Sequence, residues 1–138
     1  MNVSSTGLIL NVDDERLVRD SLSILLRAEG YEVNSVANGS EALQLASRGF
    51  YPDVLIVDFN LDPPMNGAEV AEQLRKVLRY SPPIIILTGD IGNAKFPFII
   101  EVPVWVARKP MNPGLLLSAL PSLVQLSRAT RNLPTRSA

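Results

Sequence analysis

Short apolar stretches alternate with amphipathic stretches along the chain. Five of the apolar stretches have the length of strands and are rich in Val, Ile and Leu, which favours β-structure. They are residues 7–12, 31–36, 53–59, 82–90 and 102–110. The third and fourth are almost wholly apolar until a polar residue near their ends, a pattern typical of central parallel strands covered on both faces.

Helical periodicity occupies most of the sequence between these predicted strands. Apolar residues recur at helical spacing in residues 15–29, 40–46, 67–80 and 112–126. Pro121 lies inside the last of these segments and predicts a kink or a break near Ala119. The stretch "IGNAKFPFIIEVPVW", residues 91–105, connects the fourth strand to the fifth. It contains Gly92, Pro97 and Pro103, so it predicts at most a short or distorted fourth helix.

The alternation of strand and helix predicts the fold class. It indicates an α/β, doubly wound, five-stranded parallel sheet with helices on both faces. We expect one domain over residues 1–127, followed by a polar tail or linker over residues 128–138 that carries three arginines. Folds of this class bind ligands at the carboxyl ends of their strands, where we therefore expect the functional residues.

Composition excludes several classes of function. The 138 residues are 46% hydrophobic and have a net charge of -1, which gives no electrostatic reason to expect nucleic acid or an anionic membrane as a partner. Histidine and cysteine are both absent, which excludes a Ser-His-Asp triad, a histidine metal site and a disulfide framework. No apolar run approaches the roughly 20 residues that span a bilayer, and the polar opening lacks a signal-peptide layout. We expect a cytoplasmic protein.

Charged and polar residues stand where the predicted strands end. Asp13 and Asp14 follow the first strand, Asp58 ends the third, Thr88 ends the fourth and Lys109 ends the fifth. Taken singly, the acid pair is more often a helix cap or a turn, and a lysine before a proline is usually solvated. Together they predict a site that binds a hard divalent cation through oxygen, and we expect this cation to be Mg²⁺.

Four fragments of the sequence resemble the response-regulator receiver domain of two-component signalling. They are "VDDE", "VDFN", "LTGD" and "RKP", spread in this order over nearly the whole chain. The resemblance implies a flavodoxin-like sheet with strand order 2-1-3-4-5. It also implies that Asp58 accepts a phosphoryl group from a phosphohistidine on a histidine kinase or a histidine phosphotransfer domain, either on another protein or on another part of a longer protein that includes this domain.

The same resemblance assigns the metal ligands. Mg²⁺ would be held directly by Asp14, Asp58 and the main-chain carbonyl of Asn60, with Asp13 acting through a water molecule. The cation would neutralise charge in a transition state that is loose and spreads charge over the phosphoryl oxygens.

Two more residues would act on the phosphoryl group itself. By the resemblance, Lys109 pairs with one phosphoryl oxygen and the Thr88 hydroxyl bonds another. The domain would catalyse its own phosphorylation and dephosphorylation without turning over an external substrate. It would contact neither nucleic acid nor membrane.

The chain departs from the common receiver pattern at two places. The segment after Asp58, "FNLDPPMNG", is one residue longer than usual, and Val106 stands where receivers usually have an aromatic switch residue. The long loop and the "LTGD" phrase are similar to those of the carboxyl-terminal receivers of hybrid sensor histidine kinases.

Two other classes of function fit parts of the pattern. A pseudo-receiver would be a folded binding module that is never phosphorylated, and only a phosphorylation assay separates it from an active receiver. An aspartyl-nucleophile phosphatase would need a second aspartate two residues after Asp58, where Asn60 stands.

Overall fold

A computed structural model describes residues 6–61, 63, 65–89 and 104–131 of the chain. Strands and helices alternate in the order β1 (Leu8–Val12), α1 (Arg16–Ala28), β2 (Glu32–Val36), α2 (Gly39–Ser47), β3 (Val54–Asp58), α3 (Gly67–Leu78), β4 (Ile84–Thr88), β5 (Val104–Arg108) and α4 (Pro113–Arg131). The predicted short helix between the fourth and fifth strands falls on residues 90–103, which lie outside the described residues.

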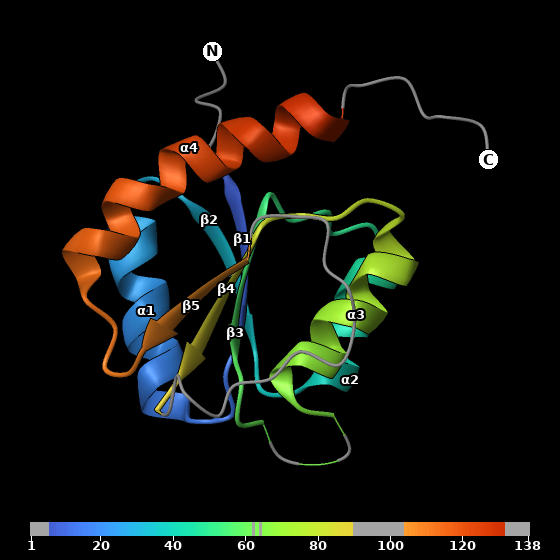
Figure 1. The fold of residues 1–138 in the computed structure, drawn as a ribbon, viewed down its shortest axis with the longest axis horizontal. Coiled ribbons are helices and arrows are strands. Elements are labelled where there is room, and N and C mark those ends of the chain that lie inside the picture. Colours follow the sequence, from blue (N-terminus) through green and yellow to red (C-terminus); the bar gives the residue numbers. More distant parts are fainter. Residues whose placement is uncertain (1–5, 62, 64, 90–103, 132–138) are drawn as a thin grey trace.

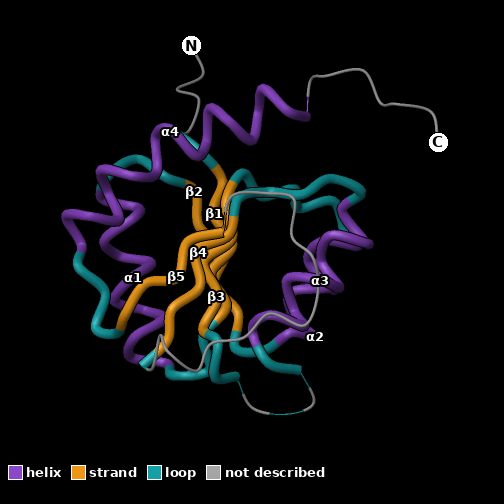
Figure 2. The backbone as a smooth tube through the Cα atoms, viewed as in Figure 1, coloured by secondary structure: helices purple, strands orange, loops and turns teal. Residues whose placement is uncertain are grey.

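The five strands form one parallel sheet in the order β2-β1-β3-β4-β5. This is the predicted fold class and strand order. Figure 1 shows α1 and α4 on one face of the sheet and α2 and α3 on the other, and Figure 2 shows the strands enclosed between these two helical layers.

Alternation along the strands produces two hydrophobic cores. On β3, Leu55 and Val57 pack with α2 and α3, while Val54 and Ile56 pack on the opposite side with α1 and α4. All four side chains are fully buried, because successive side chains of a strand point to opposite faces and both faces are covered.

The last helix is longer than its predicted segment of residues 112–126. It is continuous from Pro113 to Arg131 and has no break at Pro121, because buried leucines on both sides of this exposed proline hold it against the sheet. The helix continues to Arg131, four residues past the predicted domain boundary after residue 127, which stays a prediction. Residues 132–138 lie outside the described residues.

Two valines within the helical apolar patterns of residues 15–29 and 67–80 are exposed. Val18 on α1 is 39% exposed and Val77 on α3 is 40% exposed, while Leu22, Leu74 and similar neighbours are buried. The buried stripe of each helix is therefore narrower than the apolar stripe of the sequence. None of the helices in the described part of the chain is long and apolar enough to cross a bilayer.

Candidate functional site

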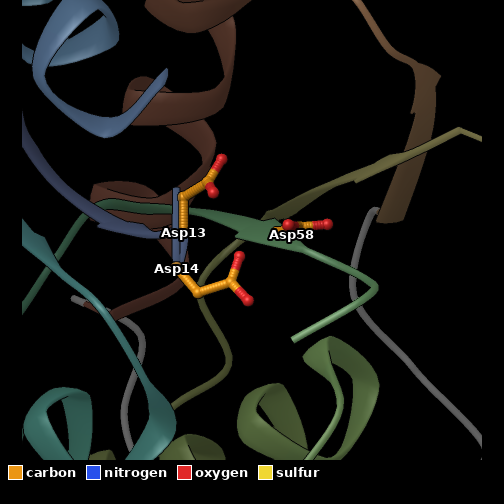
Figure 3. A group of neighbouring side chains, drawn as sticks. All are labelled: Asp13, Asp14 and Asp58. Carbon is orange, nitrogen blue, oxygen red and sulfur yellow. The ribbon is translucent and has the colours of Figure 1, made fainter. Parts of the chain in front are cut away.

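Three aspartates meet at the carboxyl end of the sheet. Asp13 and Asp14 follow β1 and Asp58 ends β3, and one carboxylate oxygen of each lies within 4.8 Å of the other two. Figure 3 shows the three side chains leaving the ends of these neighbouring strands. We call Asp13, Asp14 and Asp58 the acid cluster. Like charges at this separation repel each other, so the cluster is suited to bind a cation.

The surroundings of Asp13 disfavour its charged form. Its side chain is 1% exposed, and burial is the largest cause that raises its pKa above the ordinary value. The charges of Asp58 and Asp14 raise this pKa further, while the Glu15 N–H and the Lys109 charge lower it. The Glu15 N–H donates to Asp13 Oδ1 at 2.9 Å, which orients the carboxylate.

Asp58 is held by one cation and one main-chain amide. Its Oδ2 lies 2.9 Å from Lys109 Nζ, and its Oδ1 accepts a hydrogen bond of 3.0 Å from the Asn60 N–H. Burial by itself lowers the pKa of Lys109, but the hydrogen bond and the charge of Asp58, with the charges of Asp13 and Glu15, raise it overall. Lys109 is therefore a full positive charge at neutral pH.

Thr88 lies at the same edge of the sheet, at the end of β4. Its side chain is buried, and its carbonyl accepts a hydrogen bond of 2.9 Å from the Lys109 N–H. In the sheet register, Asp58 is opposite Leu87, so Thr88 follows the direct partner of Asp58. The structure thus gathers at one edge all six residues that the sequence assigned to the site.

Gly67, the first residue of α3, is not among the site residues that the sequence predicts. A Cβ atom at this position would lie 2.2 Å from the Asp58 carbonyl oxygen and 2.8 Å from Phe59 Cα. The Gly67 N–H also donates to the Phe59 carbonyl at 2.9 Å. Gly67 therefore lets the start of α3 lie directly on the backbone that carries Asp58.

A signal for this contact is present in the sequence. Asn66 and Glu69 form a reciprocal capping box, which marks residue 67 as the first helical residue. Glycine has no Cβ and is the usual residue where another backbone approaches closely, so a glycine directly after the cap is compatible with such a contact.

An apolar cavity of about 730 Å³ adjoins the site between α1 and the chain that follows β5. Its lining includes Leu17, Val18, Leu25, Met111 and Lys109. Leu17 is 82% exposed, so the cavity opens onto an apolar part of the α1 surface. Lys109 therefore contacts both this cavity and Asp58.

Comparison of the sequence with known proteins identifies the family. The family model of the response regulator receiver domain matches residues 9–120. The transcriptional regulatory protein SrrA of Staphylococcus aureus is 33% identical over 124 residues, which are 88% of this chain and 49% of SrrA. The chain thus spans about half the length of the curated relatives that it matches.

Solved structures share this fold. The N-terminal domain of a response regulator/sensory box/GGDEF protein from Carboxydothermus hydrogenoformans has a TM-score of 0.79 at 24% identity, covering 91% of this chain and 99% of that one. The chemotaxis protein CheY4 of Vibrio cholerae has a TM-score of 0.69 at 32% identity, covering 85% of this chain and 98% of that one. With its parallel sheet, its acid cluster and the match over residues 9–120, this chain belongs to the response regulator receiver domain family.

Proposed function

We propose that Asp58 is the phosphoacceptor of this receiver domain and that its phosphorylation requires Mg²⁺ bound at the acid cluster. Receiver domains of response regulators are phosphorylated by histidine kinases in two-component signalling. The observation that carries the proposal is the meeting of three carboxylates, within 4.8 Å, with a lysine ammonium 2.9 Å from Asp58.

The residues of the acid cluster fit Mg²⁺. They offer hard carboxylate oxygens, and both Asp13 and Asp58 are buried, so a bound cation would relieve their repulsion. Asp13, Asp14, Asp58 and Asn60 would hold the ion. When bound, Mg²⁺ supplies positive charge that stabilises the transferring phosphoryl group.

The chain's own residues align and stabilise the transfer. A carboxylate oxygen of Asp58 forms a bond to phosphorus while the P–N bond of the phosphohistidine breaks, and the electron pair of that bond stays on the imidazole nitrogen. The Asn60 N–H orients the Asp58 carboxylate. Lys109 pairs with a phosphoryl oxygen and the Thr88 hydroxyl donates to another, which offsets charge on the phosphoryl group.

The proposed partner is a histidine kinase or a histidine phosphotransfer domain, and we expect the exchange in the cytoplasm, as the sequence predicts. The partner must bring its phosphohistidine to Asp58, so it must cover the surface around Lys109. The apolar cavity beside α1 is continuous with this surface through Lys109, and exposed Leu17 lies on it. We therefore place an apolar helix of the partner on this cavity.

Phosphorylation by acetyl phosphate tests the acceptor. We expect the wild-type chain to gain one phosphoryl mass in the presence of Mg²⁺ and none in EDTA, as measured by intact-protein mass spectrometry. Asp58→Asn should gain none, while Asp20→Asn, which changes an exposed acid on α1, should behave as wild type. A wild-type chain that stays unmodified would indicate a pseudo-receiver.

A second experiment separates partner docking from chemistry. Leu17→Glu should slow phosphoryl transfer from a phosphorylated partner by about tenfold, because it places a charge on the proposed apolar contact. Its phosphorylation by acetyl phosphate should be unchanged, because this small donor needs no docking surface. Equal slowing with both donors would contradict the assignment of this surface to the partner.

A further inference from the structure

Arg19 contacts the main chain of the acid cluster. It lies in the first turns of α1, and its Nη1 donates a hydrogen bond of 2.8 Å to the Asp13 carbonyl oxygen. The guanidinium thus reaches back across the turn that joins β1 to α1. The bond reaches the backbone between the two neighbouring acids.

The Asp13 carbonyl belongs to the same peptide unit as the Asp14 N–H. Because a peptide unit is planar, holding this oxygen sets the orientation of the plane between the two acids. The Asp13 N–H is already held by the Val36 carbonyl at 3.0 Å, and Asp13 Oδ1 accepts from the Glu15 N–H at 2.9 Å. Arg19 provides the side-chain bond that completes this set of constraints around Asp13.

Arg19 is itself held by a buried polar network. Its carbonyl accepts a hydrogen bond of 2.9 Å from Ser23 Oγ. Ser23 Oγ also bonds Ser35 Oγ on β2, and Ser35 Oγ accepts from Asn11 Nδ2 on β1 at 3.4 Å. Ser23 and Asn11 are both buried. The network ties the start of α1 to the two strands beside it, so the base of the Arg19 side chain has a defined place relative to β1.

We propose that Arg19 is a positioning residue, which acts through the Asp13–Asp14 peptide to hold the acid cluster in the geometry that binds Mg²⁺. This inference rests on the proposed function, because it assumes that the acid cluster binds the ion. Arg19 need not touch the ion or the phosphoryl group.

The sign of the effect separates positioning from simple charge. Arg19 carries a positive charge near the acid cluster, so if charge alone mattered, its removal would strengthen Mg²⁺ binding. If Arg19 positions the acids, its removal weakens binding, because the carboxylates lose their preorganised arrangement. Loss of residues that orient metal ligands typically weakens metal affinity by about tenfold or more.

Calorimetric titration of the metal-free protein with Mg²⁺ tests the proposal. We expect Arg19→Ala to bind Mg²⁺ about tenfold more weakly than wild type. Arg19→Lys should restore part of the affinity, because an ammonium can donate to the same carbonyl. Arg16→Ala is the matched control: Arg16 lies on the same helix, its side chain is 84% exposed and it pairs with Asp20. It should bind as wild type.

Hydrogen exchange supplies a readout without metal. The Glu15 amide, which donates to Asp13 Oδ1, should exchange faster in Arg19→Ala than in Arg16→Ala at equal thermal stability. Phosphorylation of Arg19→Ala by acetyl phosphate should recover toward the wild-type rate at saturating Mg²⁺.

The outcomes distinguish this inference from the proposed function. If the wild-type chain binds no Mg²⁺, the proposed function fails and this inference fails with it. If wild type binds Mg²⁺ and Arg19→Ala binds it equally or more tightly, only the positioning role of Arg19 is overturned. A lower melting temperature with unchanged Mg²⁺ affinity would likewise make Arg19 a purely structural residue.

Discussion

A buried aspartate stands at each end of β3, and the two have opposite surroundings. Asp53 precedes the strand and Asp58 ends it. Both carboxylates are buried. Asp53 is bonded by two arginines and a main-chain amide, whereas Asp58 is bonded by one lysine and one amide and lies beside two other acids. The comparison shows how one strand carries a structural carboxylate at its amino end and a reactive one at its carboxyl end.

Two arginines and one main-chain amide hold the Asp53 carboxylate. Its Oδ2 accepts from the Leu8 N–H at 2.8 Å and from Arg128 Nη2 at 3.1 Å. Its Oδ1 accepts from Arg128 Nε at 3.3 Å and pairs with Arg131. The Arg131 guanidinium also lies 4.8 Å from the centre of the Tyr80 ring. Such a carboxylate has little remaining capacity for a ligand, and it anchors the last turns of α4 to the start of the sheet.

Asp58 has one lysine and one amide as described donors, and it shares its site with Asp13 and Asp14. Lys109 pairs with Asp58, and the charges of Asp14 and Asp58 both raise the pKa of Asp13, so the like charges of the cluster repel one another. Buried acids in such surroundings are costly for stability and are typical of functional sites. The two ends of β3 therefore differ in function. The fold itself provides the partners of the Asp53 carboxylate, whereas Asp58 belongs to a cluster of acids that is suited to bind a cation.

Exchanging each aspartate for asparagine should have the largest and most contrasting effects. Asp58→Asn should abolish phosphorylation by acetyl phosphate and leave the free energy of unfolding equal or higher, because one of three repelling charges is removed. Asp53→Asn should retain phosphorylation in the folded protein. Mass spectrometry measures the phosphorylation, and urea denaturation measures the free energy of unfolding. If Asp58→Asn were destabilising and Asp53→Asn were not, the structural role of Asp53 and the functional role of Asp58 would be wrongly assigned.

Asp53→Ala should lower the free energy of unfolding by about 3 kcal/mol, because two arginines and the Leu8 N–H lose their acceptor. Urea denaturation in the absence of metal measures this change. Arg128→Ala should cost only about 1 kcal/mol, since this side chain is 46% exposed and Arg131 remains. Equal losses for the two variants would mean that Asp53 is not the centre of the network.

Gly67→Ala should be destabilising by about 2 kcal/mol, because the added Cβ would lie 2.2 Å from the Asp58 carbonyl. It should also slow phosphorylation by acetyl phosphate, because displacement of the β3 end moves Asp58 relative to Lys109. Gly89→Ala is the stability control, since a Cβ there meets nothing within 4 Å. Unchanged stability and rate in Gly67→Ala would show that α3 can shift without moving Asp58.

Asp13→Asn should have the smallest effect, a pH-dependent gain of stability without metal. The fold raises the pKa of Asp13 above its ordinary value of 3.8, so ionised Asp13 costs stability, and this cost grows as the pH rises from 3.8 through the pKa in the fold. Asparagine removes the charge and keeps the Oδ1 acceptor for Glu15. We expect Asp13→Asn to raise the melting temperature at pH 7 and to lose this advantage below pH 3.8. A gain that is independent of pH would contradict this explanation.

Much of the functional site was predictable because of the geometry of parallel sheets. The carboxyl ends of parallel strands meet at one edge, so residues that end different strands are brought together even when they are far apart in sequence. Asp13, Asp58, Thr88 and Lys109 each follow or end an apolar run, and this was sufficient to group them. The role of Gly67 was missed because it depends on the distance between a helix start and a strand end.

Hydrophobic periodicity along the chain was enough to place the strands and helices, because it reports which side of each element is buried. It did not show that α4 continues to Arg131, because its last turn is polar and is held by a carboxylate 78 residues earlier in the chain. Nor did it distinguish Asp53 from Asp58, which stand at the two ends of one apolar run. Charge neutralisation depends on which groups lie within a few ångströms of each other, and that proximity exists only once the helices have packed on the sheet.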